Sequence, residues 1–181
     1  FKKLKSLRDH GAYQSDLTRH KKNNFQLSDH KYAGYNYRMT DIQGAVGVEQ
    51  MKKLPRILTE RKKKAEIYNQ ALKNNPHLST PFVPKNCFHS YQSYVISIKK
   101  NSPVARNKIA EKLIKLGIST RPGTQSVPHL NFYRKKYNFT SANFPQALEA
   151  EKQTLTLPLF VGLMQKEQNF IIKNLNHLCA E

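Results

Sequence analysis

The sequence contains 181 residues, a length that fits one domain or a domain with an attached helical segment. Hydrophobic residues make up 38% of it, enough for a modest core, which excludes a wholly disordered chain. The formal net charge of +19 leaves nucleic acid, an anionic membrane surface and an acidic protein as candidate partners.

The positive charge is spread along the chain rather than gathered in one tract. Short basic runs occur at 2–3, 21–22, 61–64 and 134–136. The sequence shows no zinc-ligand spacing, no recognisable nucleic-acid motif and no arginine-rich tail. Solvated surfaces therefore explain the charge better than nucleic-acid binding, which is the weakest of the functions considered below.

Three features bear on where the protein works. No apolar run is long enough to span a membrane, and the first residues lack the apolar core of a signal peptide. Cys87 and Cys179 lie far apart, so free thiols in a reducing cytoplasm are the simpler interpretation, with one disulfide left open. The chain also begins without Met and inside an amphipathic pattern, as a piece of a longer protein would. We expect a cytoplasmic protein with no membrane partner.

The first eight residues predict the end of a helix, which a C-cap at Gly11 closes. From 12 to 33 the sequence is polar and aromatic without a clear period, which predicts a long irregular loop. His10, His20 and His30 fall in this part of the chain, but no Cys or carboxylate pattern accompanies them. We expect them to be exposed or to anchor the loop rather than to bind a metal.

The stretch 34–50 joins a polar, aromatic loop directly to a helix start. Thr40 and Gln43 form a capping-box pattern, in which the Thr hydroxyl accepts from the Gln amide and the Gln side chain returns to the cap. This pattern predicts that the helix begins at Asp41, whose carboxylate then meets the positive end of the helix dipole.

The loop 35–38 is therefore held at a helix N-terminus, where backbone amides and the dipole favour anions. Asn36 and Arg38 add an amide and a guanidinium to this position. One interpretation is a site for a phosphate ligand. The other is that the two side chains only tie the loop down, and spacing does not separate the two.

Two helices are predicted next. The first runs from Asp41 toward Leu54, where Pro55 either kinks it or opens a new helix. The second covers about 55–73 and carries one apolar stripe. The segment 74–86 is rich in Asn and Pro and predicts a linker.

The remaining sequence alternates strand and helix patterns. Residues 90–98 end in alternating apolar and polar side chains and predict a strand, and Ser102 with Pro103 predicts a helix that Gly117 ends. The later predictions are a strand at 118–121, a helix at 144–152, a strand at 154–159 and a helix at 164–178. This order predicts an α+β domain with a largely antiparallel sheet.

Five motifs follow one another along the chain: GYNYRMTDIQ, RKKKAEIYNQAL, SYQSYVI, LGISTRPGT and TLPLF. Together they resemble the C-terminal half of the DegT/DnrJ/EryC1/StrS family, the pyridoxal-phosphate-dependent nucleotide-sugar aminotransferases. The resemblance covers nearly the whole chain and implies the C-terminal part of a fold-type I aminotransferase. In that α+β arrangement, 1–40 end the large domain and carry an active-site loop, 41–75 form bridging helices, and 76–181 form the small domain.

The resemblance also implies a reaction. Family members use pyridoxal 5′-phosphate, bound to a lysine as a Schiff base, to pass an amino group from a glutamate-type donor to a keto-sugar nucleotide. That lysine is expected upstream of Phe1, so the isolated chain is expected to be inactive. It would work in a homodimer with a shared site and serve the synthesis of amino sugars and polysaccharide.

The loop residues then acquire implied roles. Asn36 resembles the residue that reaches the cofactor phosphate of the neighbouring subunit, and Arg38 lies where it meets cofactor or substrate anions. Tyr35 is a candidate substrate contact. Together with Tyr37 it either packs on the sugar or only stiffens the loop.

Three small-domain residues, Tyr91, Arg121 and His129, resemble positions that face the active-site mouth. Arg121 suits a nucleotide diphosphate, although an arginine at a strand end is also a common ion-pair partner. Family members often place a histidine where this chain has Pro128, and a second one where it has Gln125. These departures weaken the prediction of the substrate-facing wall.

Two functions of other classes compete with the aminotransferase hypothesis. One is a non-catalytic binding or assembly module that pairs with another chain, and the other is a basic nucleic-acid-binding domain. A steep loss of affinity with salt would favour nucleic acid, because phosphate contacts release counterions. Dependence on a partner without a salt slope would favour the assembly module.

Overall fold

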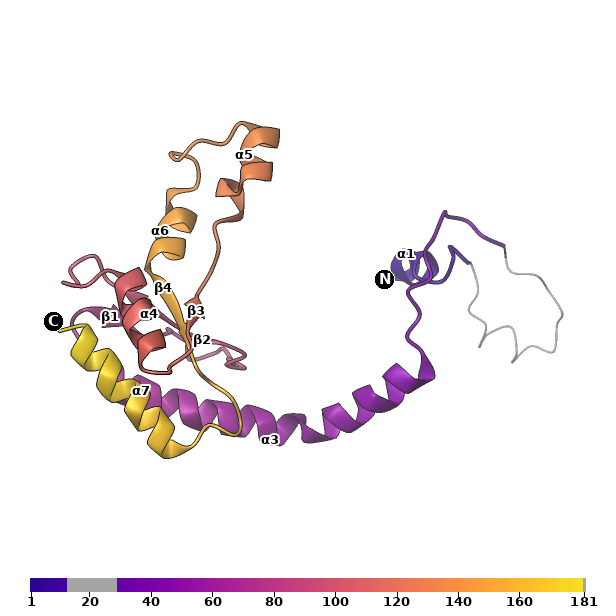
Figure 1. Ribbon diagram of the computed structural model, residues 1–181. Coiled ribbons are helices and arrows are strands. Elements are labelled where there is room, and N and C mark those ends of the chain that lie inside the picture. The colour runs from indigo at the N-terminus through magenta and orange to yellow at the C-terminus, as the bar shows by residue number, and fades with distance from the viewer. Residues whose placement is uncertain (13–28, 181) are drawn as a thin grey trace. The chain divides into compact units, whose positions relative to one another are not determined.

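The computed structural model describes residues 1–12 and 29–180 (Figure 1). Contacts divide the chain into two compact units, 1–53 and 54–181. Most of the predicted irregular loop, with His20, lies outside the described residues. The three-part division implied by the family resemblance remains a prediction.

The first unit opens with α1 (Lys2–Leu7), the short helix predicted for the start of the chain. After α1, Gly11 has a φ of 77°, and its amide donates a hydrogen bond of 2.8 Å to the Ser6 carbonyl. Glycine enters this left-handed region without a steric penalty from Cβ. The prediction of a C-cap at Gly11 is wrong, because α1 ends at Leu7 with Arg8 as its C-cap, and Gly11 belongs to the turn that follows.

The long helix α3 (Asp41–Leu72) begins at the predicted residue. The Thr40 amide donates to Gln43 Oε1 at 3.0 Å and the Gln43 amide to Thr40 Oγ1 at 3.3 Å, which confirms the capping box. Pro55 lies inside α3, so the prediction of two helices is wrong. Pro55 has no N–H, so α3 loses one backbone hydrogen bond there, and burial of the later turns of the helix offsets this loss. The Pro55 carbonyl accepts from the Thr59 hydroxyl at 3.0 Å.

The second unit is built on one antiparallel sheet with the order β1-β2-β4-β3, as the α+β pattern predicted. Its strands are β1 (Leu78–Ser79), β2 (Tyr94–Ile98), β3 (Arg121–Pro122) and β4 (Thr154–Leu157). The central pair β2–β4 carries the predicted alternation, with every second residue buried. The strand predicted at 118–121 is shorter and later than expected, because only Arg121 and Pro122 pair with β4 as the edge strand β3.

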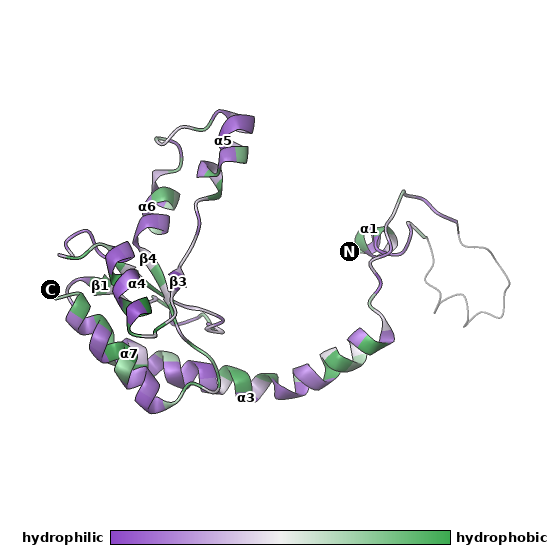
Figure 2. Cartoon of the chain, in the orientation of Figure 1, coloured by the Kyte–Doolittle hydropathy of each residue, from purple (hydrophilic) through white to green (hydrophobic). Residues whose placement is uncertain are grey.

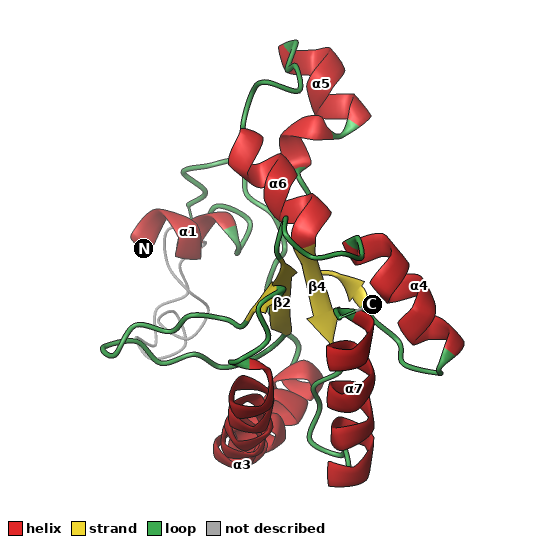
Figure 3. Cartoon of the chain, turned by 90° about the vertical axis from the view of Figure 1, so that its left-hand side faces the viewer, coloured by secondary structure: helices red, strands yellow, loops and turns green. Residues whose placement is uncertain are grey.

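Helices cover the sheet and extend from one end of it (Figure 3). They are α4 (Arg106–Lys115), α5 (Asn131–Tyr137), α6 (Pro145–Gln153) and α7 (Gln165–Leu178), with a short 3-10 helix, η1 (Val127–His129). The last two helices match their predictions. α4 begins later than predicted because the Ser102 hydroxyl donates to the Val104 carbonyl in a turn before the helix. Neither α5 nor η1 was predicted.

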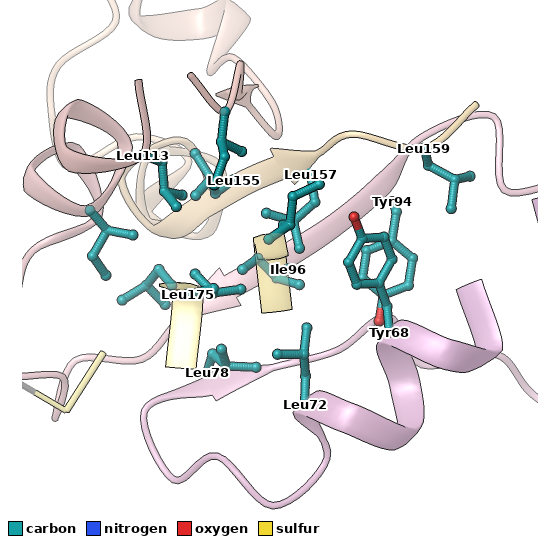
Figure 4. Packing of buried hydrophobic residues seen from close by; sticks show 14 of the residues in the cluster. Tyr68, Leu72, Leu78, Tyr94, Ile96, Leu113, Leu155, Leu157, Leu159 and Leu175 are labelled. Atoms are coloured by element: carbon teal, nitrogen blue, oxygen red, sulfur yellow. The ribbon is translucent and has the colours of Figure 1, made fainter. Parts of the chain in front are cut away.

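The core lies where the second half of α3, the sheet and α7 meet (Figure 4). Tyr68 of α3 and Tyr94 of β2 have ring centroids 4.8 Å apart and are both fully buried. The Tyr68 hydroxyl donates to the Pro158 carbonyl at 2.9 Å and the Tyr94 hydroxyl to Asn69 Oδ1 at 2.7 Å. Each buried hydroxyl therefore has a partner, as stable burial of a tyrosine requires. In the part of the chain described here, no helix is long and apolar enough to cross a membrane.

Alkaline pH is expected to destabilise this core. Burial raises the pKa of the Cys179 thiol from 9.0 to about 11, and it also raises the pKa of the Tyr68 and Tyr94 hydroxyls. The unfolded chain releases these protons at lower pH than the folded chain does. The free energy of unfolding should therefore be constant below pH 9 and fall as the pH rises toward 11.

Urea unfolding between pH 7 and pH 11 measures this dependence. The Cys179→Ala variant is the control and should lose less stability than the parent chain between pH 9 and 11. A parent chain equally stable at pH 8 and 11 would contradict the burial of these groups. Exposed Cys87 should also react with a thiol reagent in the folded chain, whereas buried Cys179 should react only after unfolding.

Candidate functional site

The predicted site residues fall into two groups. Tyr35, Asn36 and Arg38 belong to the first unit, and Tyr91, Arg121 and His129 belong to the second. Each group is described within its own unit. Among residues 1–12 and 29–180, no cluster of His, Cys, Asp and Glu is arranged to hold a metal ion.

The loop before α3 is fixed by backbone hydrogen bonds to the turn after α1. The Tyr35 amide donates to the Leu7 carbonyl at 2.7 Å, the His10 amide to the Tyr35 carbonyl at 2.9 Å, and the Tyr37 amide to the Arg8 carbonyl at 2.8 Å. The partner segment is a turn, with Arg8 in the right-handed helical region and His10 at a φ of 56°, and Asn36 forms an isolated antiparallel bridge with Asp9. The side chains of the loop are thereby presented in a fixed order.

Two glycines allow the segments to approach this closely. A Cβ built on Gly34 would lie 2.1 Å from the Gly11 amide nitrogen, and one on Gly11 would lie 1.8 Å from the Tyr32 carbonyl oxygen. Both distances are far below van der Waals contact. Glycine at the head of the GYNYR motif is therefore a requirement of the loop's backbone pairing.

The loop side chains fall into two sets. The rings of Tyr35 and Tyr37 stack with centroids 5.2 Å apart and planes 9° apart, which supports their predicted stiffening role. Arg38 Nε lies 3.3 Å from Asp9 Oδ1, so this guanidinium is anchored, as the loop-tying interpretation held. Asn36 is exposed, and its side chain has no hydrogen-bond partner among the described residues. Asn36 is thus the residue of the loop best placed to bind a ligand.

In the second unit, Tyr91 belongs to the core more than to a surface. Its side chain is only 7% exposed, and its ring packs 4.4 Å from the His89 ring and 6.3 Å from the Tyr94 ring. Its backbone has a φ of 48°, held by its carbonyl, which accepts from Arg61 Nη1 at 2.9 Å. Tyr91 therefore offers little surface to a substrate, and its predicted binding role remains a prediction.

Arg121 lines a cavity of about 500 Å³ beside the edge strand β3. The other lining residues are Arg106, Pro122, Thr124, Gln125 and Glu151. Arg106 is anchored because its Nη2 donates to the Glu151 carbonyl at 2.5 Å and its Nε to the Lys152 carbonyl at 3.1 Å. Arg121 is exposed and has no ion-pair partner in the described chain, so its guanidinium is available to an anion.

The cavity wall continues into a buried polar cluster that contains His129. Ser126 Oγ lies 2.6 Å from His129 Nδ1, and the Ser126 amide donates to Glu151 Oε2 at 2.5 Å. His129 Nε2 is buried and has no partner among the described residues. Because Glu151 binds the Ser126 backbone and not the imidazole, the three residues do not form a catalytic triad. They hold η1 beside the cavity.

Sequence reasoning did not find Arg106, Ser126 or Glu151. Nothing in their local sequence distinguishes them, because Arg106 opens a helix and Glu151 lies near the end of another. Their role follows from the pairing of β3 with β4, which brings the two helices' ends to Arg121. A local pattern carries no signal for such an arrangement.

The lysines test whether this chain could bind a carbonyl cofactor covalently. A lysine that forms a Schiff base needs a desolvated amine with oriented partners. Among the described lysines, Lys64 and Lys112 are half-buried and every other one is exposed. Lys64 Nζ is held by the Leu163 carbonyl at 2.6 Å. Among the described residues, Asn36 therefore suits the phosphate group of such a cofactor, whereas no lysine has the surroundings that suit its reactive carbonyl group.

Comparison with known proteins identifies the class of fold and site. The model of the DegT/DnrJ/EryC1/StrS aminotransferase family matches residues 1–176, and the chain belongs to this family. The cofactor of these aminotransferases is pyridoxal phosphate. The resemblance drawn from the five sequence motifs is confirmed.

Particular relatives give the extent of the similarity. The chain is 28% identical to the spore coat polysaccharide biosynthesis protein SpsC of Bacillus subtilis, with 94% of this chain and 44% of the relative aligned. It is 27% identical to the UDP-4-amino-4,6-dideoxy-N-acetyl-beta-L-altrosamine transaminase of Campylobacter jejuni, with 93% and 42% aligned. A Streptococcus pneumoniae protein assigned as a sugar aminotransferase, solved in its PMP form, has the same fold, with a TM-score of 0.83 and 24% identity over 98% of this chain and 44% of that one. The chain spans less than half the length of these proteins.

The close approach at Gly34 yields a prediction. Gly34→Ala should push the two paired segments apart, at about 1 to 3 kcal/mol of overpacking. Amide hydrogen exchange should then accelerate at Tyr35, Tyr37 and His10. Gly44→Ala is the matched control, because nothing lies within 4 Å of a Cβ at Gly44 and alanine should stabilise the helix by about 1 kcal/mol. Equal exchange in both variants would show that the pairing does not depend on Gly34.

Proposed function

We propose that the chain is part of a pyridoxal-phosphate-dependent aminotransferase that acts on a keto-sugar nucleotide with a glutamate-type amino donor. Within a homodimer it supplies the dimer-interface loop and the small-domain wall of the site, and the Schiff-base lysine belongs to sequence upstream of Phe1. The observation that carries the proposal is the geometry of the loop at 34–40. Backbone hydrogen bonds hold this loop before the capped start of α3, and the Asn36 side chain has no hydrogen-bond partner among the described residues. When bound, the cofactor supplies an electron sink for amino transfer.

Asn36 is the residue proposed to hold the cofactor phosphate. Its amide group can donate two hydrogen bonds, and α3 begins at Asp41, a few residues further along the chain. Arg38 adds positive charge nearby, while its contact with Asp9 keeps the guanidinium oriented. Tyr35 and Tyr37 stiffen the loop through their stacked rings, and Tyr35 presents the outer ring surface proposed to meet the sugar.

Arg121 is the residue proposed to bind the diphosphate of the sugar nucleotide. A guanidinium matches two phosphate oxygens at once, and the cavity beside β3 adds Thr124 and Gln125 as neutral hydrogen-bonding groups. Arg106 brings a second positive charge, which the nearby Glu151 balances in part. His129 contributes indirectly, since its contact with Ser126 supports the same wall.

The exposed Cys87 thiol and the buried Cys179 thiol are both free, which supports a reducing compartment such as the cytoplasm. An aminotransferase of sugar nucleotides would provide amino sugars there for polysaccharide assembly. The relative from Bacillus subtilis, a polysaccharide biosynthesis protein by name, supports this destination.

The position of the lysine is tested by adding pyridoxal phosphate to the 181-residue chain. Borohydride reduction and intact mass spectrometry then count the adducts. We expect no single-site adduct, because exposed lysines react weakly and without selectivity. A stoichiometric adduct on one lysine would place the Schiff-base residue inside this chain and overturn that part of the proposal.

The diphosphate site is tested by titrating the chain with UDP in a calorimeter. Arg121→Gln should weaken binding by about tenfold or more, because a hydrogen bond to a charged group contributes about 1.5 to 3 kcal/mol. Arg56→Gln, at an exposed position of α3 in the same unit, should leave the affinity unchanged. Equal affinities for all three proteins would show that Arg121 does not contact the nucleotide.

One observation favours a second candidate, the non-catalytic assembly module. Hydrophobic residues recur along the first turns of α3 (Figure 2), and Ile42 is 79%, Val46 57%, Val48 57% and Met51 63% exposed. A helix that is apolar on all sides is normally buried against other polypeptide. Binding of a protein partner with neither UDP binding nor a response to pyridoxal phosphate would support this candidate.

A further inference from the structure

The segment around α5 carries a run of aromatic rings in mutual contact, which we name the α5 aromatic surface. It consists of Phe132, Tyr133, Tyr137, Phe139 and Phe144. Tyr133 stacks on Tyr137 with planes 13° apart, and Tyr137 stacks on Phe139 with planes 28° apart. Phe132 and Phe144 meet the two ends of the row edge to face. α5 extends away from the sheet (Figure 3).

These rings lie outside the hydrophobic core. Phe132 is 64% exposed, Tyr137 51% and Phe144 50%, and none of the five belongs to the buried cluster around Tyr94. Burying a large aromatic side chain contributes strongly to stability, so a row of half-exposed rings on one short segment is not explained by folding of the described chain. The exposed parts of Phe132, Tyr137 and Phe144 are available for stacking with a ligand.

Positive charge surrounds the same surface. Arg134, Lys135 and Lys136 are exposed on α5, and Lys136 Nζ lies 5.5 Å from the Phe132 ring centroid and 5.4 Å from that of Tyr137. The sequence has no acidic residue between Glu111 and Glu149. Within the described chain, the three cations of α5 have no ion-pair partner. The surface therefore combines π faces with uncompensated positive charge.

We propose that the α5 aromatic surface binds single-stranded nucleic acid. Proteins that bind single strands without sequence preference combine aromatic rings, on which bases stack, with cations that follow the phosphates. Both elements are present here, as the exposed rings of Phe132, Tyr137 and Phe144 and as the cations at 134–136. This binding is independent of the proposed amino transfer. The basic run at 134–136 is visible in the sequence, but the contacts between the rings arise only when α5 and the turn to Phe144 bring them together.

Other partners match the surface less well. An acidic peptide would use the cations but would leave the ring faces without stacking partners. A membrane surface is normally bound by a longer amphipathic helix, whereas α5 has seven residues. Double-stranded DNA hides its base faces, so the rings would add nothing to phosphate contact.

The test is fluorescence anisotropy of a labelled single-stranded oligothymidine of about twelve nucleotides, within the usual site range, with the 181-residue chain. Phe132→Leu/Tyr137→Leu keeps apolar volume and removes two ring faces. Lys135→Gln/Lys136→Gln removes two charges and keeps the rings. Lys62→Gln/Lys173→Gln, at exposed helical positions elsewhere in the same unit, is the matched charge control. Circular dichroism checks that each variant is folded.

The ring variant should weaken binding about fivefold or more, because base stacking on an aromatic residue contributes about 1 to 3 kcal/mol. The α5 charge variant should lower the slope of log affinity against log salt by about 1.4, at about 0.7 for each phosphate contact. The control should change both quantities less. An equal effect of the two charge variants, equal binding of duplex DNA, or tighter binding to anionic vesicles than to the oligonucleotide would overturn the proposal.

Discussion

The packing of the second half of α3 against the sheet is the contact on which the second unit depends. Tyr68 meets Tyr94 across this boundary, and its hydroxyl is satisfied by the Pro158 carbonyl beyond the end of β4. About two turns earlier, Arg61 Nη1 donates to the carbonyls of Tyr91, Gln92 and Leu159 at 2.9, 3.0 and 3.2 Å. A single guanidinium thus joins the segment before β2 to the segment after β4. Because a buried carbonyl without a donor is costly, these bonds select one arrangement of helix and sheet.

This arrangement also determines the candidate anion site of the second unit. With β4 held against β2, its other edge pairs with Arg121 and Pro122. The end of α6 immediately before β4 then presents Glu151, which accepts from Ser126 and whose carbonyl anchors Arg106. The cavity is consequently a product of core packing, although its lining residues are polar. At this cavity Arg106 donates to two backbone carbonyls, whereas Arg121 has no ion-pair partner in the described chain.

The first unit uses backbone geometry instead of a hydrophobic core to present its loop. Hydrogen bonds between the loop and the turn after α1, permitted by Gly11 and Gly34, hold the loop directly before the capped helix start. The proposed contact of Asn36 with the cofactor phosphate depends on this geometry, since a phosphate needs donors at a fixed position. The hydrophobic turns that follow are exposed in this chain and are suited to contact with further polypeptide.

Short-range physics let the sequence by itself determine the capping box at Thr40, the alternating strand at 94–98, and the family through its five motifs. Each of these depends on residues within a few positions of one another. Only the tertiary structure decided the features that join distant residues. α3 continues through Pro55 because packing of its later turns outweighs one lost hydrogen bond. Arg121 and Arg106 line the same cavity because the pairing of β3 with β4 brings them to it. The α5 aromatic surface likewise depends on the turn between α5 and Phe144, which no periodic sequence pattern predicts. Its rings come into contact only in the folded chain.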